Sequence, residues 1–249
     1  MDRRLERLDI RGALSAVADL ALPRVCLVCG AQLLPEEKHL CVCCLGDLPL
    51  TRFENLDRNP MADKLNALLD EDPFAPYSCA SALYYYREGS GYDRISQELK
   101  YRRGFSCGKY FSALLGARLA SSKLYSDVDL VIPVPLHPLR RIKRGYNQAE
   151  VIGKELAAAL GAAMRTDILK RVRRTHTQTT LDSEHKLLNV QGAFKACGAK
   201  GSLDGARHIL LVDDVFTTGS TLSSCHKALR GAAGAQVRIS VATLGFVGD

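Results

Sequence analysis

The stretch His208-Ile-Leu-Leu-Val-Asp-Asp-Val-Phe-Thr-Thr-Gly-Ser-Thr221 decides the fold of this chain. Its apolar beginning predicts a buried strand over 208–215, and the residues from 221 onward predict a helix. The strand delivers Asp213 and Asp214 to its carboxyl end, the edge at which open α/β sheets bind ligands. The stretch therefore predicts a parallel sheet with a ligand site at this edge.

The turn between this strand and the helix is rich in groups that bind anions. Free backbone N–H groups at a helix start form an anion cradle together with nearby hydroxyls, and Gly219 permits close approach of a ligand. The cradle residues are Thr217, Thr218, Gly219, Ser220 and Thr221. Two carboxylates beside a phosphate cradle suit a ribose 5-phosphate. The alternative is a turn in which one hydroxyl caps the helix. It explains neither the acidic pair nor the run of hydroxyl residues and glycine at 217–221.

Outward from this stretch, strand and helix patterns alternate. We expect strands over 81–87, 129–135, 208–215 and 237–244, and helices over 92–100, 109–121, 147–160 and 221–230. The alternation predicts an α/β fold, a mostly parallel twisted sheet flanked by helices. Residues 171–192 lack clear periodicity, which is typical of an active-site lid.

The chain divides by composition into four parts. Residues 1–22 predict an amphipathic helix, 23–50 a cysteine-rich domain, 51–76 a connecting segment with one helix, and 77–249 the α/β domain. Acidic residues near the start argue against a signal peptide, so we expect a cytoplasmic protein.

Five of the nine cysteines lie between 26 and 44. Two C-x-x-C pairs at short separation are the spacing of a tetrahedral zinc site, for which we expect Cys26, Cys29, Cys41 and Cys44 as ligands. Cys43 is an alternative to Cys44, and His39 is a weaker one. Reduced thiols or a disulfide are the competing interpretation, although disulfides are rare in the cytosol. Four thiolates would close the coordination sphere, so the zinc would be structural.

The positive charge is local. The chain of 249 residues has a formal net charge of +7 and a mean hydropathy of −0.06. Residues 137–176 hold ten Lys or Arg and three acidic residues, so the excess lies there. This segment suits an anionic partner. No stretch approaches roughly 18 uncharged apolar residues, which excludes a membrane span.

Several motifs resemble one family. Residues 210–221 look like the phosphoribosyl-diphosphate (PRPP) motif of type I phosphoribosyltransferases, and the cysteine pairs and four other segments look like its competence-protein-F branch. Those four segments are Leu99–Arg102, Ile132–Pro138 with Arg144–Ala149, Arg174–Gln178, and Asn189–Phe194. The resemblance covers roughly residues 22–245.

The resemblance implies a type I phosphoribosyltransferase fold with a small zinc-knuckle domain and a set of ligand contacts. Asp213 and Asp214 would bind the ribose hydroxyls as the catalytic pair, and the cradle at 217–221 would hold the 5-phosphate. Mg²⁺ would sit on the diphosphate. The implied diphosphate-loop, basic and lid residues are Leu136, His137, Arg144, Arg174 and Gln178. Lys186 stands where the family commonly has Arg.

Two functions follow as hypotheses. The first is a Mg²⁺-dependent phosphoribosyltransferase acting on a base or amine, because the motif at 210–221 is intact. The resemblance also implies an association with DNA uptake in competence. The second is a binding module that keeps this fold and engages single-stranded DNA, or a helicase-like partner of the DNA-uptake machinery, through its basic face and zinc knuckle.

Overall fold

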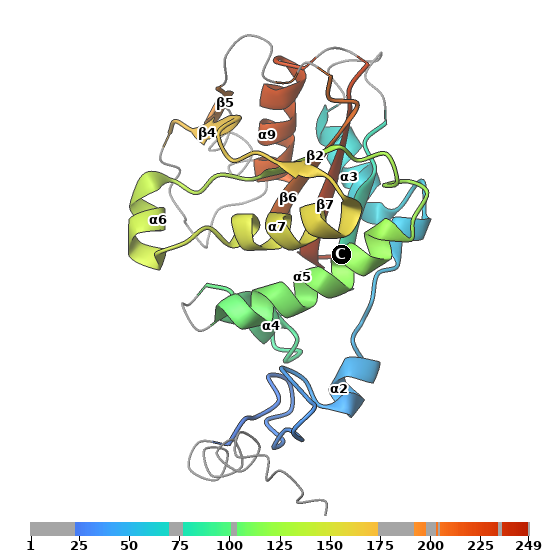
Figure 1. The fold of residues 1–249 in the computed structure, drawn as a ribbon, viewed down its shortest axis with the longest axis vertical. Helices are drawn as coiled ribbons and strands as arrows, with labels where there is room; N and C mark the ends of the chain where they lie inside the picture. The colour runs from blue at the N-terminus through green and yellow to red at the C-terminus, as the bar shows by residue number, and fades with distance from the viewer. Residues whose placement is uncertain are drawn as a thin grey trace, which may run out of the picture. The chain divides into compact units, whose positions relative to one another are not determined.

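The strand that decides the fold is β6 (His208–Phe216), the middle strand of a five-stranded sheet with the order β1-β7-β6-β2-β3. Every pairing in this sheet is parallel. Residues 208–212 of β6 are buried because helices cover both faces of the sheet. The predicted α/β fold with a mostly parallel sheet is confirmed (Figure 1).

The computed structural model describes residues 23–69, 77–100, 104–173, 192–197, 203, 205–233 and 236–248. The chain divides into two compact units, Met1–Leu48 and Pro49–Asp249. The helix expected over 1–22 lies outside the described residues. In the first unit the described part contains the short helix α2 (Val42–Gly46).

The second unit follows the predicted alternation of strands and helices closely. Its strands are β1 (Ala80–Tyr85), β2 (Leu130–Pro133), β3 (Ala163–Met164), β4 (Leu169–Arg171), β5 (Phe194–Ala196), β6 and β7 (Arg238–Phe246). Its helices are η1 (Phe53–Asn55), α3 (Pro60–Leu69), α4 (Asp93–Glu98), α5 (Phe105–Ala120), α6 (Pro138–Arg144), α7 (Gln148–Leu160) and α9 (Ser220–Arg230). None of the described helices is long and apolar enough to span a membrane.

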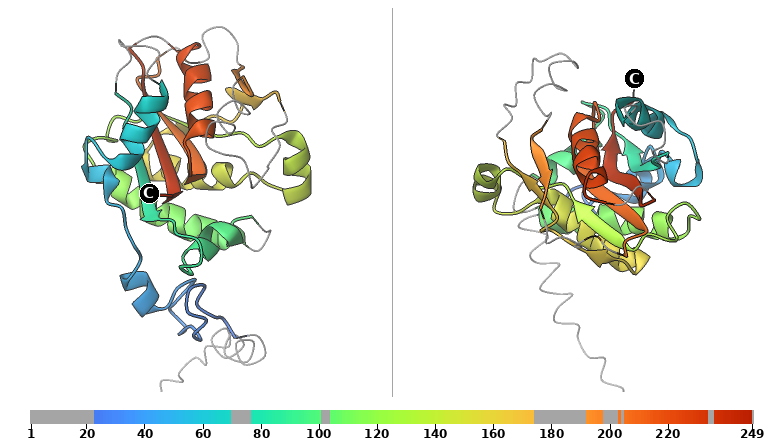
Figure 2. Two further views of the ribbon diagram at one scale, coloured as in Figure 1. Left: turned by 180° about the vertical axis from the view of Figure 1, so that it is seen from behind. Right: turned by 90° about the horizontal axis from the view of Figure 1, so that it is seen from above.

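The helices form a layer on each face of the sheet (Figures 1 and 2). Helices α3 and α9 pack on one face, and α5 and α7 pack on the other. Within the segment 51–76, expected as a connecting segment, α3 contributes Met61 and Leu65 to the apolar core beside Leu222 and Leu229 of α9. Helix α3 therefore packs as part of the α/β unit.

Local interactions explain where α7 begins and ends. The Asn147 side chain accepts a hydrogen bond from the Ala149 N–H, and its amide donates to the Val134 carbonyl, 2.9 Å away. The first of these caps the helix, and the second ties its start to the carboxyl end of β2. Gly161 ends the helix in the left-handed conformation at φ 65°.

Several short elements of the second unit were not predicted. Helix α6 follows the proline-rich end of β2, β3 has two residues, and β4 and β5 form an antiparallel two-stranded sheet. β4 and β5 flank the segment expected as a lid, of which residues 174–191 lie outside the described part of the chain.

A buried histidine on α9 makes the stability depend on pH. His226 is 3% exposed, its Nε2 lies 2.8 Å from the Ser78 hydroxyl, and burial lowers its pKa to about 4. The unfolded chain binds this proton near pH 6.5, so folding loses stability as pH falls from 6.5 toward 4, by up to about 3 kcal/mol. In urea unfolding at pH 7, 5.5 and 4.5, His226→Gln should show a shallower loss than the wild type. Lys227→Gln, an exposed neighbour, should follow the wild type; equal pH slopes for both variants would contradict this role.

Candidate functional site

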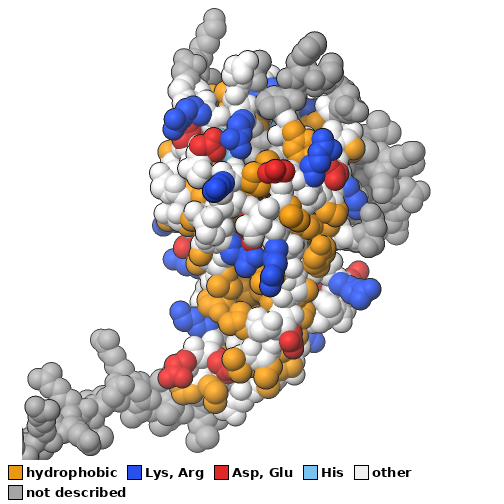
Figure 3. All heavy atoms as spheres, turned by 90° about the vertical axis from the view of Figure 1, so that its right-hand side faces the viewer, with side chains coloured by type: hydrophobic (Ala, Val, Ile, Leu, Met, Phe, Trp, Pro, Cys, Tyr) orange, Lys and Arg blue, Asp and Glu red, His pale blue; other side chains and the backbone are white. Residues whose placement is uncertain are grey.

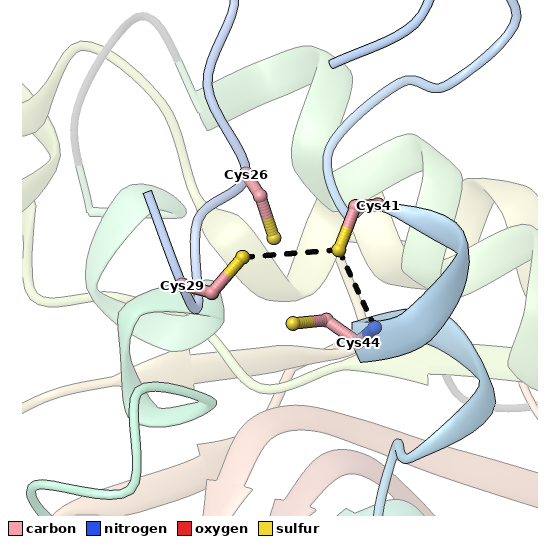
Figure 4. Close-up of side chains that lie close together, drawn as sticks. All are labelled: Cys26, Cys29, Cys41 and Cys44. Carbon is pink, nitrogen blue, oxygen red and sulfur yellow. Dashed lines mark hydrogen bonds between the residues drawn. The ribbon is translucent and has the colours of Figure 1, made fainter. Parts of the chain in front are cut away.

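Four cysteine sulfurs of the first unit converge on one point. The sulfur atoms of Cys26, Cys29, Cys41 and Cys44 all lie within 4.8 Å of one another (Figure 4). We call these four residues the thiol cluster. Cys43 is exposed and lies outside this group, so Cys44 is the fourth member, and His39 is not a member.

Backbone turns bring these thiols together. In the first pair the Gly30 N–H donates to the Cys26 carbonyl at 2.9 Å, with Gly30 at φ 74°, a conformation that favours glycine. In the second pair Cys41 precedes α2, and its sulfur accepts from the Cys44 N–H at 3.5 Å. Each C-x-x-C pair is thus a knuckle that presents two sulfurs.

The loops that carry the knuckles are held together by one carboxylate. Glu37 accepts hydrogen bonds from the Leu34 and Val42 N–H groups, both at 2.7 Å. Arg24 donates to the carbonyls of Glu37 and Leu34. These bonds pre-arrange the two halves of the thiol cluster.

The cluster fits zinc. With Zn–S bonds of about 2.3 Å, tetrahedral geometry places sulfurs about 3.8 Å apart. The Cys29 and Cys41 sulfurs are separated by 3.8 Å. Four thiolates are the donor set of a structural zinc site, in which no coordination position remains for a substrate.

The thiols of the cluster have unequal proton affinities. Burial acts to raise the pKa of Cys26, but hydrogen bonds involving the backbone of Cys29, Cys41 and Val28 lower it to about 6. Burial and the neighbouring thiols raise the pKa of Cys44. Four other cysteines lie outside the cluster: Cys107 and Cys225 are buried, and Cys79 and Cys197 are half-buried.

A second group of polar residues lies at the carboxyl edge of the large sheet. We use the name sheet-edge site for Asp213, Asp214 and residues 217–221. β6 pairs with β2 up to Val212, whose carbonyl accepts from the Val134 N–H at 2.8 Å. Residues 135–137 therefore leave the sheet at the same edge as the acidic pair.

The charges of the acidic pair perturb each other and nearby groups. Burial and the charge of Asp214 raise the pKa of Asp213, whereas the charge of Arg171 on β4 acts to lower it. The charge of Asp214 raises the pKa values of Tyr84 and Tyr86, for both of which burial is the larger cause.

The turn after the acidic pair is tight and requires glycine. Gly219 has φ 77°, and a Cβ there would lie 2.7 Å from the Phe216 ring. The hydroxyls of Thr218 and Ser220 form a hydrogen bond of 2.8 Å, and α9 begins at Ser220. Thr217 is exposed, and Thr218 and Thr221 are half-buried, so hydroxyls line the start of α9.

The structure brings only some of the other predicted ligand residues to this sheet edge. Leu136 and His137 are half-buried and follow β2 at the same sheet edge. Arg144, at the end of α6, donates to the Gln148 carboxamide at 3.0 Å. Arg174 and Gln178, and with them Lys186, lie outside the described residues.

These observations define the class. The chain is an α/β protein with a parallel sheet, an acidic strand end followed by a hydroxyl-rich turn, and a separate unit whose thiol cluster fits a zinc knuckle. No protein-family model matches the chain.

Individual curated proteins are similar to the chain. The chain is 28% identical over 214 residues to competence protein F of Haemophilus influenzae, across 76% of this chain and 90% of that protein. It is 37% identical over 111 residues to DNA utilization protein YhgH of Salmonella typhi, a match that spans 47% of that protein. Competence protein ComFC of Streptococcus pneumoniae is 29% identical over 139 residues, across 57% of its length. The chain is homologous to these competence and DNA utilization proteins.

Proposed function

We propose that this chain acts in the uptake or use of DNA and that its sheet-edge site binds PRPP with Mg²⁺. The family relatives are named for competence and DNA utilization, which supports the first part. The observation that carries the second part is the end of β6, where two carboxylates are followed by a hydroxyl-rich turn at a helix start.

In this proposal each part of PRPP meets a chemically suitable group of the sheet-edge site. Ionised carboxylates accept hydrogen bonds from the two ribose hydroxyls. The N–H groups and hydroxyls at 217–221 take the 5-phosphate at the start of α9. The diphosphate would lie beside residues 135–137, and Mg²⁺, when bound, would neutralise part of its charge. Transfer of the phosphoribosyl group to a base or amine would rest on positioning and electrostatics rather than on a protein nucleophile.

Calorimetry tests this proposal. Titrating PRPP with Mg²⁺ into the zinc-loaded full-length protein should give heat at one site per chain. Ribose 5-phosphate should bind at the same site more weakly, because it lacks the diphosphate. A folded protein that gives no heat with PRPP at millimolar concentration would refute the PRPP part.

The second candidate function is binding of single-stranded DNA by the basic segment, residues 137–176. Ile142 of α6 is 79% exposed, and Lys154 and Lys170 are exposed. Part of the charge is already compensated, because Arg141 pairs with Glu150 at 3.0 Å and Arg165 pairs with Asp167 at 2.7 Å. Figure 3 draws the side of the α/β unit that lies away from α6, and on that face basic, acidic and hydrophobic side chains are intermixed.

A salt titration separates this candidate from PRPP binding. If phosphate contacts hold the oligonucleotide, its affinity falls as salt rises, with a log–log slope of roughly −0.7 for each phosphate neutralised. An affinity for the oligonucleotide that does not change with salt would argue against the basic segment as the binding surface.

A further inference from the structure

The turn of the sheet-edge site packs against two side chains that come from different elements. Apart from the adjoining chain, the three atoms nearest to the place of a Cβ on Gly219 belong to Phe216 and Leu68. That Cβ would lie 2.7 Å from Cζ of Phe216 and 3.0 Å from Cδ1 of Leu68. Non-bonded carbon atoms pack at about 3.5–4.0 Å, so the ring and the methyl group fill the space that a Cβ would need. The backbone of Gly219 therefore packs directly against both side chains.

The ring of Phe216 has a fixed position because it belongs to a buried group of aromatic side chains. Its centre lies 5.8 Å from the centre of the Phe246 ring on β7. The Phe246 ring lies 5.5 Å from that of Phe53, with the two planes nearly at right angles, at 68°. All three rings are buried members of the apolar core. Phe216 thus presents a rigid surface to the turn.

Leu68 comes from α3, which lies in the segment expected to connect the two units. Helix α3 packs beside α9 (Figures 1 and 2), and Leu68 is half-buried. One turn earlier on the same helix, the ammonium nitrogen of Lys64 lies 5.7 Å from the centre of the Phe246 ring. Residues four positions apart share one helix face, so the face of α3 that carries Lys64 and Leu68 is turned toward the aromatic group and Gly219. A helix outside the 208–221 stretch therefore supports its turn.

The conformation of Gly219 decides how the first N–H groups of α9 are oriented. Gly219 precedes the helix at φ 77°, and its carbonyl accepts a hydrogen bond from the Ser223 N–H at 2.8 Å. Because glycine stands at the capping position, no capping side chain occupies the N–H groups at 221 and 222. A phosphate at a helix start is bound by such N–H groups, which must point to one place.

We propose that Leu68 is a positioning residue of the sheet-edge site. Together with Phe216 it holds Gly219 in the conformation that directs the first N–H groups of α9 toward the 5′-phosphate of the ligand. The inference deepens the proposed function and rests on it. In this role Leu68 acts through Gly219. Without the methyl group the glycine gains room, and since glycine adopts many backbone conformations, the donors lose their alignment.

Calorimetry with ribose 5-phosphate on the zinc-loaded full-length protein tests this inference. The matched control is Leu69→Ala, because Leu69 is also half-buried and packs against the apolar core but is not among the nearest neighbours of Gly219. Leu68→Ala should bind about 10-fold more weakly than Leu69→Ala, within the roughly 100-fold that a misplacement of about 1 Å can cost, while its Tm is no lower. Leu68→Met, which refills the space, should recover most of the affinity. Equal affinities in folded Leu68→Ala and Leu69→Ala would overturn the inference.

A second measurement needs no ligand. Nitrogen-15 relaxation of the backbone N–H groups of Gly219 and Ser220 should give lower order parameters in Leu68→Ala than in Leu69→Ala, because the turn moves more when its support is removed. A wild-type protein that does not bind ribose 5-phosphate would refute the proposed function and leave this measurement intact. Where Leu68→Ala does not fold, Leu68→Val shortens the side chain less and should change the order parameters in the same direction. Unchanged order parameters at both N–H groups contradict the role of Leu68.

Discussion

A protein with both Asp213→Asn and Asp214→Asn is expected to bind PRPP and Mg²⁺ at least about 100-fold more weakly than the wild type. Hydrogen bonds to a charged partner contribute roughly 1.5–3 kcal/mol each, and the double substitution weakens two of them. Asparagine keeps the carbonyl oxygens that accept from the Asp214 and Val215 N–H groups, so the local backbone is preserved. Calorimetry on the folded variant measures the loss.

The same substitution should not lower the stability of the fold. The folded-state pKa of Asp213 lies well above the ordinary value, so its ionisation costs stability as pH rises from about 4 toward that pKa. Asp213→Asn removes this cost, and at pH 7 its Tm should equal or exceed that of the wild type. Asp167→Asn, an exposed control, should leave PRPP affinity unchanged. Retained affinity in the double variant, or equal loss in the control, would refute the assignment of the acidic pair.

Serine in place of Cys26 or Cys41 is expected to remove zinc from the protein and to unfold the described part of the first unit. Residues 23–48 bury few apolar side chains, and Leu33, Leu40 and Leu48 are the leucines among them. A core of this size does not fold without a metal or disulfide, so zinc binding is coupled to folding. Zinc content by mass spectrometry should fall from one to zero per chain, and a protease should cut between 23 and 48.

The adjacent cysteine provides the matched control. Cys43 is exposed, lies outside the thiol cluster and differs from Cys44 by one position on α2. Cys43→Ser should keep one zinc per chain and resist the protease, whereas Cys44→Ser should lose both. Equal zinc content in the two variants would contradict the ligand set.

The longer strands and helices of this fold were predictable because each has its own sequence pattern. β6 has a run of apolar residues followed by two acids, and α7 has an asparagine cap before it and Gly161 after it. These local signals agree with the tertiary structure, so the parallel sheet and its flanking helices follow from the sequence.

Short elements were not predictable, for a physical reason. β3 has two residues, and β4 and β5 have three each, which is too short for a period of two to be recognised. Their formation depends on packing against the rest of the α/β unit.

The choice between Cys43 and Cys44 shows the same limit in the first unit. The spacing of the second pair permits either residue, because C-x-C and C-x-x-C both place two thiols close in sequence. The α2 turn settles it: Cys44 lies one turn after Cys41, and its N–H donates to the Cys41 sulfur. Three-residue spacing puts both side chains on one helix face.

A crystal of the zinc-loaded protein soaked with PRPP and Mg²⁺ tests the central claim most directly. We expect density for the ribose at Asp213 and Asp214, for the 5-phosphate at the N–H groups and hydroxyls of residues 217–221, and for the diphosphate beside residues 135–137. Density for PRPP at another place on the chain, or an empty sheet edge at a PRPP concentration that saturates the protein in solution, would contradict it.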